Sequence, residues 1–390
     1  MLFLTFIALI FCLQFLHRRL LHLILPTGRD HWATPLLLLI HLPLAVYVGL
    51  RLTGHGLAGD WLRPWARALL YFQMLTVLNL FLWLVATAIW RMGHLWREGF
   101  TVPPENPDRR KFLRQTSAAG ASIAAYGVLV GHREARSDPE VVRVDLAFPD
   151  LPPGLDCLRI AQLSDLHSGP LVHLEQLRRW RRIAEAERAE LVVFTGDIVD
   201  NLPSEADNFV LAFKGMAAPL GMFAILGNHD YFTDPRPIWR SLEGIGIRFL
   251  ENRNALVTRR NGTLGLLGLQ DPMARHGQFR DINYGPGPSP DLAAQGIPPG
   301  AWRLCLNHRP SDWPLARATG AHLTLSGHTH GGQVNLIPGL SSALILGRYT
   351  AGLYREGDDL LYVNRGLGVV GLPVRIAAKP EITVITLHRG

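Results

Sequence analysis

The chain has 390 residues, of which 48% are hydrophobic, and its formal net charge is +7 at pH 7. The charge is unevenly distributed: residues 1–137 hold 14 Lys and Arg against 6 Asp and Glu, whereas residues 138–390 hold 25 against 26. The basic excess therefore accompanies apolar N-terminal segments, as in membrane proteins, and a nucleic-acid groove in the second part is not favoured. Three scattered cysteines indicate neither a disulfide framework nor a thiolate metal site.

Three apolar segments precede residue 91. Ala68–Trp90 contains 23 residues without a formal charge, and about 20 apolar residues suffice to span a bilayer. Leu2–Leu16 and Pro35–Leu50 are shorter, so they indicate either two further spanning helices or one spanning and one interfacial helix. We predict that residues 1–131 form a membrane region with three to four transmembrane helices.

A basic loop follows the third apolar segment. Arg91–Arg114 contains six positive residues, which predicts that this loop faces the cytoplasm. Within it, Arg109-Arg110-Lys111-Phe112-Leu113 precedes the weakly apolar stretch Thr116–Val130 and resembles a twin-arginine export signal. An ordinary fourth helix with basic flanks is the alternative. Both interpretations predict a multi-pass protein of the cell membrane, with an uncleaved anchor and an extracytoplasmic domain after about residue 132.

Residues 132–155 are expected to form a linker and a first strand, and the pattern then alternates. Apolar runs that predict buried strands are separated by amphipathic runs that predict helices. The expected strands are Arg159–Leu163, Leu191–Thr195 and Met222–Leu226, and the expected helices are Leu171–Ala189 and Ala206–Ala217. This order is typical of an α/β sheet with its functional residues at the carboxyl ends of the strands.

After the short run Ile247–Leu250, the pattern indicates a second, more antiparallel sheet. Ala255–Arg260 and Thr263–Leu269 flank Asn261-Gly262, a pair that favours a tight hairpin turn. Further strands are expected at Trp302–Leu306, His322–Ser326, Asp359–Val363 and Glu381–Leu387. Asp271–Gly300 holds six Pro and five Gly and is expected to be a long surface loop. The predicted fold class is therefore α/β, with a four-layer α/β/β/α sandwich after the membrane region.

Five polar motifs each follow one of the strand-like runs. They are Asp165-Leu166-His167, Gly196-Asp197-Ile198-Val199-Asp200, Gly227-Asn228-His229-Asp230, Asn307-His308 and Gly327-His328-Thr329-His330. Together they supply carboxylates, imidazoles and an amide, which are suitable ligands for two divalent cations such as Mn, Fe or Zn. The candidate metal ligands are Asp165, His167, Asp197, Asn228, His308, His328 and His330.

Two further residues of these motifs are candidates for catalysis. His229 is not needed as a ligand, so it can approach a phosphate and protonate the leaving oxygen. Asp230 can hold the His229 ring in one tautomer, as carboxylates near metal sites often do. Two cations about 3.5–4 Å apart are a recurrent device for displacement at phosphorus, with metal-activated hydroxide as the nucleophile.

The five motifs together resemble those of the calcineurin-like metallophosphoesterase superfamily, over about residues 156–390. The resemblance implies that one cation takes Asp165, His167, Asp197 and His330, and that the other takes Asp197, Asn228, His308 and His328. It also implies that His229 is the catalytic acid.

Three further segments resemble the membrane-associated bacterial branch that carries twin-arginine-type leaders. They are Gly331-Gly332-Gln333, Arg348-Tyr349-x-x-Gly352-Leu353 and Arg365-Gly366-x-Gly368. Members of that branch are similar to phosphodiesterases that act on lipid-linked or nucleotide-linked phosphates, including UDP-diacylglucosamine hydrolases. The predicted function is therefore a membrane-anchored phosphoesterase that cleaves a phosphodiester, pyrophosphate or phosphomonoester, including lipid-linked ones.

Two other classes of function remain open. The first is a catalytically silent metal-binding module of the same fold. The second is a transporter or sensor with an attached esterase. A transport path needs polar groups within the membrane, and the N-terminal segments hold few of them. The uncharged segment Leu336–Leu346 is interpreted either as a lipid-contacting surface or as a core strand.

Overall fold

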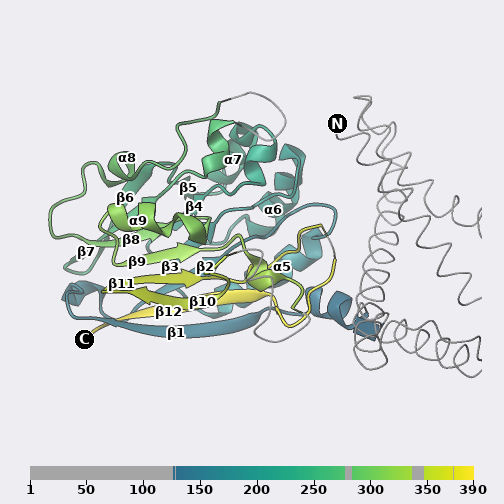
Figure 1. Cartoon of the computed structure of the whole chain (residues 1–390), viewed down its shortest axis with the longest axis horizontal. Coiled ribbons are helices and arrows are strands. Elements are labelled where there is room, and N and C mark those ends of the chain that lie inside the picture. Colours follow the sequence, from purple (N-terminus) through teal and green to yellow (C-terminus); the bar gives the residue numbers. More distant parts are fainter. Residues whose placement is uncertain (1–125, 128, 277–282, 336–346, 372) are drawn as a thin grey trace, which may run out of the picture. The chain divides into compact units, whose positions relative to one another are not determined.

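A computed structural model describes residues 126–127, 129–276, 283–335, 347–371 and 373–390 (Figure 1). The chain divides into two compact units, residues 1–130 and 131–390. Of the first unit, only four residues are described. The three predicted segments before residue 91, the twin-arginine-like motif and Leu336–Leu346 therefore lie outside the described residues, and of Thr116–Val130 only residues 126–127 and 129–130 are described, as helix. Within the described ranges, no helix has the length and apolar character needed to cross a bilayer.

The first sheet of the second unit contains six strands in the order β1–β12–β2–β3–β4–β5. Their bounds are β1 Glu140–Phe148, β2 Leu158–Leu163, β3 Leu191–Thr195, β4 Met222–Ile225, β5 Ile247–Phe249 and β12 Glu381–Arg389. Strands β2 to β5 are parallel, β12 is antiparallel to β2, and β1 is parallel to β12. Figure 1 shows β1 in blue beside β12 in yellow, so both ends of this unit lie in one sheet.

The second sheet also has six strands, in the order β10–β11–β9–β8–β7–β6. Their bounds are β6 Arg253–Arg259, β7 Gly262–Gly268, β8 Trp302–Leu306, β9 Leu323–Ser326, β10 Gly352–Glu356 and β11 Asp359–Val363. Among the described strands, antiparallel pairs occur only at its two edges, β6 with β7 and β10 with β11. The central strands β7, β8, β9 and β11 are parallel, so the antiparallel character predicted for this sheet is confined to its hairpins.

Helices cover the outer face of each sheet. The α-helices described after β1 are α5 Leu174–Ala186, α6 Ala206–Phe213, α7 Pro235–Glu243, α8 Pro290–Ala294 and α9 Trp313–Ala318. The short 3-10 helices are η2 Pro153–Leu155, η3 Pro203–Glu205, η4 Asp230–Phe232, η5 Pro272–Arg275, η6 Pro310–Asp312 and η7 His330–Gly332.

Alternate residues of each strand point to opposite faces, and this alternation divides the core into three layers. Ala161 and Phe194 pack against α5 and α6 through Trp180 and Phe209. The intervening strand residues, such as Ile160 and Val193, face the second sheet instead. On the outer face of the second sheet, Leu361 packs with Trp313 of α9. The predicted four-layer α/β/β/α sandwich is confirmed.

Three predictions differ from the structure. Glu381–Leu387, expected in the second sheet, is part of β12 in the first sheet, because its backbone pairs with both β1 and β2. The hairpin pairs Arg259 with Gly262, so its turn residues are Arg260 and Asn261, one position earlier than predicted. Gly262 is instead closely packed, because a Cβ there would lie 3.0 Å from the Gly154 Cα. The region Asp271–Gly300 is not simply a loop, since its described parts include η5 and α8.

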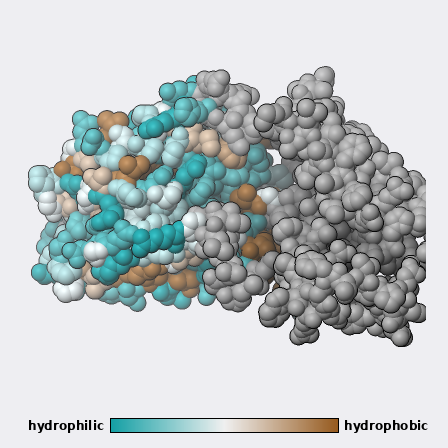
Figure 2. Space-filling view, in the orientation of Figure 1, coloured by the Kyte–Doolittle hydropathy of each residue, from teal (hydrophilic) through white to brown (hydrophobic). Residues whose placement is uncertain are grey.

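The described surface is mainly hydrophilic on the face shown in Figure 2, where apolar residues are scattered among polar ones. This is consistent with a domain whose apolar side chains are largely used in the three core layers.

Candidate metal centre

The predicted ligands lie at the carboxyl ends of β2, β3, β4, β8 and β9. Several of them have left-handed backbone conformations, which are uncommon for residues other than Gly. The φ angles are 52° for Asp165, 47° for His167, 51° for Asp197, 72° for His328 and 52° for His330. Such turns redirect the chain at each strand end, and they are often found at functional sites. They bring side chains from five separate strand ends into one buried cluster.

One half of the cluster contains Asp165, His167 and His330. Their candidate ligand atoms all lie within 4.8 Å of one another. The Nε2 atoms of His167 and His330 are 3.1 Å apart, and Nε2 of His330 lies 3.5 Å from Oδ1 of Asp165. The backbone N–H of His328 donates to Asp165, as does the Ser164 hydroxyl. Burial raises the pKa of Asp165, which the positive charge of His308 opposes.

The other half contains Asp197, His308 and His328, whose candidate ligand atoms also lie within 4.8 Å of one another. Nε2 of His308 is 3.3 Å from Oδ2 of Asp197, 3.2 Å from Oδ1 of Asn228 and 3.3 Å from Nδ1 of His328. Oδ2 of Asp197 is also 3.6 Å from Nε2 of His167. The Asp197 carboxylate therefore lies between the two halves.

The orientation of His308 is set by the backbone. Its Nδ1 lies 2.8 Å from the Thr195 carbonyl, so Nδ1 donates and Nε2 faces Asp197. Burial lowers the pKa of His308, but the adjacent Asp197 carboxylate outweighs this and raises that pKa to about 10. Burial raises the pKa of Asp197, yet His308 holds it well below its usual range. Burial and the charge of His308 lower the pKa of His328 to about 3. Without a bound cation, the pKa values of these two neighbouring imidazoles are therefore shifted in opposite directions, and a cation at Nε2 of His308 requires that ring to be neutral.

These residues fit two divalent cations. Carboxylate oxygens, imidazole nitrogens and an amide oxygen converge in a volume where Asp165, His167 and Asp197 are almost completely buried. In the described part of the chain, the buried His167 Nδ1 has no hydrogen-bond partner, and the nearby Asp200 carboxylate is 3.6 Å away. Imidazole nitrogens that face one another at 3.1–3.3 Å are arranged as ligands of a common cation would be.

His229 lies at the edge of this cluster. Its Nδ1 is 2.7 Å from the Asp200 carbonyl, and its backbone N–H donates to Oδ1 of Asp197 at 2.8 Å. Its ring meets that of His167 edge-on, with centroids 4.6 Å apart. Burial lowers the pKa of His229. His229 also forms a third group of candidate ligands with His167 and Asp197, so the geometry allows both the acid role and a ligand role.

Asp230 does not have the predicted contact with the His229 ring. Its carboxylate instead accepts backbone N–H groups of Ile198, Val199 and Gly227, at 3.0, 3.1 and 2.8 Å. It thereby ties the loop after β3 to the loop after β4. Burial raises the pKa of Asp230 to about 7, with Asp197 contributing. The Asp200 carbonyl is the group that orients His229. The identity of a side chain does not predict a backbone contact, so the only signal in the sequence was that Asp200 belongs to the second motif.

Comparison with known proteins agrees with this geometry. The family model "Calcineurin-like phosphoesterase" matches residues 158–332. An uncharacterized metallophosphoesterase of Bacillus subtilis, YkuE, is 31% identical over 72% of this chain and 97% of its own length. Phosphodiesterase YaeI of Escherichia coli is 30% identical over 72% of this chain and 98% of its own length. The chain belongs to the calcineurin-like phosphoesterase family.

Vertebrate proteins also match. A zebrafish (Danio rerio) "Transmembrane protein with metallophosphoesterase domain" is 33% identical over 71% of this chain and 64% of its own length. The match therefore spans somewhat less than two thirds of that relative. Proteins of this family use divalent metals, which agrees with the donor set described above.

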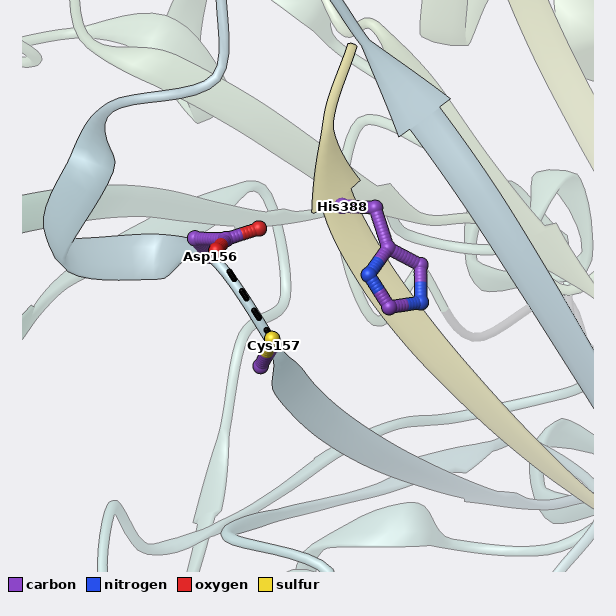
Figure 3. A group of neighbouring side chains, drawn as sticks. All are labelled: Asp156, Cys157 and His388. Atoms are coloured by element: carbon purple, nitrogen blue, oxygen red, sulfur yellow. Dashed lines mark hydrogen bonds between the residues drawn. The ribbon is translucent and has the colours of Figure 1, made fainter.

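A further group of candidate ligands lies away from this centre, where β2 begins and β12 ends. Figure 3 shows Asp156, Cys157 and His388, with one ring nitrogen of His388 directed toward the other two side chains. Asp156 accepts the backbone N–H of Arg389 at 2.9 Å, and Nε2 of His388 lies 3.1 Å from Asp145. Cys157 is exposed. These contacts describe a surface cluster of hydrogen bonds rather than a metal site. The three residues also lie outside the range matched by the family model.

Proposed function

We propose that this chain is a metal-dependent phosphoesterase with a dinuclear centre. The observation that carries the proposal is the position of Asp197, whose Oδ2 faces His308 at 3.3 Å and His167 at 3.6 Å. One buried carboxylate between two sets of nitrogen and oxygen donors is suited to bridge two cations. Asp165, His167 and His330 would complete one site, and Asn228, His308 and His328 the other.

The bound cations would polarise a phosphoryl oxygen and make a water molecule easier to deprotonate. The chain's own groups supply orientation and proton transfer. The Thr195 carbonyl orients the ring of His308, and Asp230 holds the turn from which Asp197 projects. His229 would protonate the leaving oxygen through Nε2, because its Nδ1 is held by the Asp200 carbonyl.

We further propose that the enzyme acts at a membrane, on the extracytoplasmic side, with phosphodiesters or lipid-linked pyrophosphates as substrates. Support comes from the apolar N-terminal segments of the sequence and from the names of the vertebrate relatives, which describe transmembrane proteins. The name of the Escherichia coli relative, a phosphodiesterase, supports diesters as the substrate class. An anchor would confine the centre near lipid headgroups.

The test combines elemental analysis of the purified full-length chain with a screen of phosphomonoesters, phosphodiesters and lipid-linked pyrophosphates. The proposal predicts two divalent cations per chain and hydrolysis of at least one class. Two bound cations without hydrolysis would favour a silent binding module of the same fold. A chain that binds no divalent cation under any condition would contradict the proposal.

A further inference from the structure

Arg375 lies directly behind the candidate metal centre and is completely buried. Nη2 of its guanidinium lies 3.1 Å from Nδ1 of His330. This is the ring nitrogen opposite to Nε2, which faces Asp165 and His167. Arg375 follows β11 by twelve residues and belongs to none of the five motifs.

The other contacts of this guanidinium are with backbone carbonyls. Nε donates to Gly368 at 3.0 Å, Nη1 donates to Arg365 at 3.0 Å and to Ala378 at 2.8 Å, and Nη2 donates to Gly366 at 3.1 Å. The partners described for it are thus carbonyl oxygens and one imidazole nitrogen, with no carboxylate among them. Burying a charge is costly, and here the carbonyls that accept from the guanidinium and the nearby carboxylates of Asp165, Glu134 and Glu381 offset that cost.

The segment that Arg375 holds packs onto Asp165. The backbone N–H of Gly368 donates to the Asp165 carbonyl at 2.7 Å, and that of Leu367 donates to the Ser164 carbonyl at 2.9 Å. A Cβ at Gly366 would lie 2.8 Å from the Asp165 Cβ. The Arg365-Gly366-x-Gly368 motif therefore supports the left-handed turn at Asp165 from behind.

Arg375 joins this support to His330. The planar guanidinium carries five N–H donors in a rigid fork, so it can bind several carbonyls in fixed directions at once, and its Nη1 also lies 3.5 Å from the His330 carbonyl. A Lys side chain has the same charge but not the fork. Arg375 therefore contacts both His330 and the segment beneath Asp165. Nε2 of His330 and Oδ1 of Asp165 are themselves 3.5 Å apart.

We propose that Arg375 is a positioning residue that fixes the segment 365–368 behind Asp165 and thereby holds this carboxylate in place for one of the two cations. The proposal rests on the metal centre proposed above. It predicts that loss of the fork weakens cation binding at the half with Asp165, His167 and His330, and leaves the half with Asn228, His308 and His328 intact. Loss of a group that orients a ligand typically lowers metal affinity about 10–100-fold.

The experiment measures Mn²⁺ binding to the full-length chain by equilibrium dialysis and by electron paramagnetic resonance. Arg375→Lys keeps the charge and removes the fork. Arg259→Lys is the matched control, because Arg259 is also buried, donates to the carbonyls of Gly154 and Asp156, and pairs with Glu190 away from the centre. We expect Arg375→Lys to bind one Mn²⁺ as the wild type does and the second about 10–100-fold more weakly. Arg259→Lys should bind both normally.

If the buried ammonium of Arg375→Lys prevents folding, Arg375→Gln carries the test, since its amide is uncharged and keeps two donors in a plane. Unchanged affinity for both cations in a folded Arg375 variant would overturn the positioning role. An equal weakening in Arg259→Lys would do the same, because it would show a general effect of losing a buried Arg. A wild-type chain that binds no Mn²⁺ would instead contradict the proposed function itself.

Discussion

At the scale of single residues, the centre depends on a few buried side chains whose protonation is set by their neighbours. Asp197 is the most connected of them. It faces His308 and His167, and its Oδ1 accepts the backbone N–H of His229. Asn is nearly the same size as Asp but carries no charge. Replacing Asp197 by Asn therefore tests the effect of its charge while keeping its shape.

Asp197→Asn is expected to lose at least one cation and most hydrolysis, because a neutral amide cannot balance two divalent charges. Elemental analysis of the variant beside the wild type measures this directly. Asp207→Asn, on the first turn of α6, serves as the control and should retain both cations. Two cations and full turnover in Asp197→Asn would show that this residue is not the bridge.

His229→Ala is expected to keep both cations and to lower turnover about 10²–10⁴-fold on substrates with poor leaving groups. Only the protonated ring can act as an acid, and burial lowers the pKa of His229. The advantage of the wild type should therefore fade as pH rises through that pKa. Turnover of an alkyl and a nitrophenyl diester across a pH series measures this, and loss of a cation in the variant would identify His229 as a ligand.

At the scale of elements, the loops after β3 and β4 approach one another too closely for any side chain. A Cβ at Gly227 would overlap Oδ1 of Asp197 and lie 2.7 Å from Cε1 of His308. Asp230 holds the same two loops together through three backbone N–H groups. The strand ends therefore form one packed unit beneath the centre.

Gly227→Ala should displace Asp197 and lower cation affinity by about tenfold or more, with a moderate loss of stability. Gly244→Ala is the control, because its added Cβ would lie 3.3 Å from the Ser241 carbonyl at the end of α7, away from the centre. Calorimetric titration with Mn²⁺ and thermal unfolding of both variants give the comparison. Equal cation affinity in the two variants would contradict this account of the loop contact.

The buried carboxyl group of Glu251, in the connection between β5 and β6, links that connection to the end of β4 and to η4. Glu251 accepts the Leu226 backbone N–H at 2.7 Å and is hydrogen-bonded to the Tyr231 hydroxyl. Burial raises the pKa of Glu251 from 4.5 to about 8. Between these two values the unfolded chain releases a proton that the folded chain retains, so the free energy of unfolding falls as pH rises.

Glu251→Gln removes this titration and keeps the shape of the side chain. The decrease in stability from pH 5 to pH 8 should therefore be smaller in the variant than in the wild type, by an amount of the order of a few kcal/mol. Thermal unfolding of metal-free protein at several pH values measures it. Glu175→Gln, at an exposed site on α5, is the control. Parallel pH profiles for Glu251→Gln and the wild type would contradict the buried, protonated state of Glu251.

Several elements were missed by the sequence patterns, although one had a local signal. Helix α7 starts at Pro235 after Asp234, whose side chain accepts the Arg236 backbone N–H. An Asp followed by Pro is a recognised helix start, so this helix was predictable. Helix α9 and strand β10 have only six and five residues, which is too short for a hydrophobic period to be recognised in the sequence.

At the scale of the whole molecule, the charge distribution predicts sidedness. The six positive residues of Arg91–Arg114 predict that this loop lies in the cytoplasm and that Thr116–Val130 carries the chain outward. Reporter fusions at residue 140 should give active alkaline phosphatase and an inactive cytoplasm-only reporter. The opposite result would place the phosphoesterase domain in the cytoplasm.

The same fusions distinguish the two export routes. Replacing Arg109 and Arg110 by Lys keeps the charge but disrupts a twin-arginine signal. Twin-arginine export should then collapse, whereas an ordinary basic-flanked helix should keep its orientation.

The sequence by itself determined the alternation of strands and helices, the four layers, and the set of polar residues at the strand ends. These are encoded locally, by hydrophobic period and by short motifs that follow each strand. The tertiary structure alone decided which of those residues meet, because the contacts join distant segments: His308 binds the Thr195 carbonyl across 113 residues. It also decided that Asp230 accepts backbone N–H groups of the loop after β3 and that the Asp200 carbonyl orients His229. Finally, it buried the charged Arg375 in the interior. No local pattern predicts a buried guanidinium, since the carbonyls that stabilise it converge only when the chain has folded.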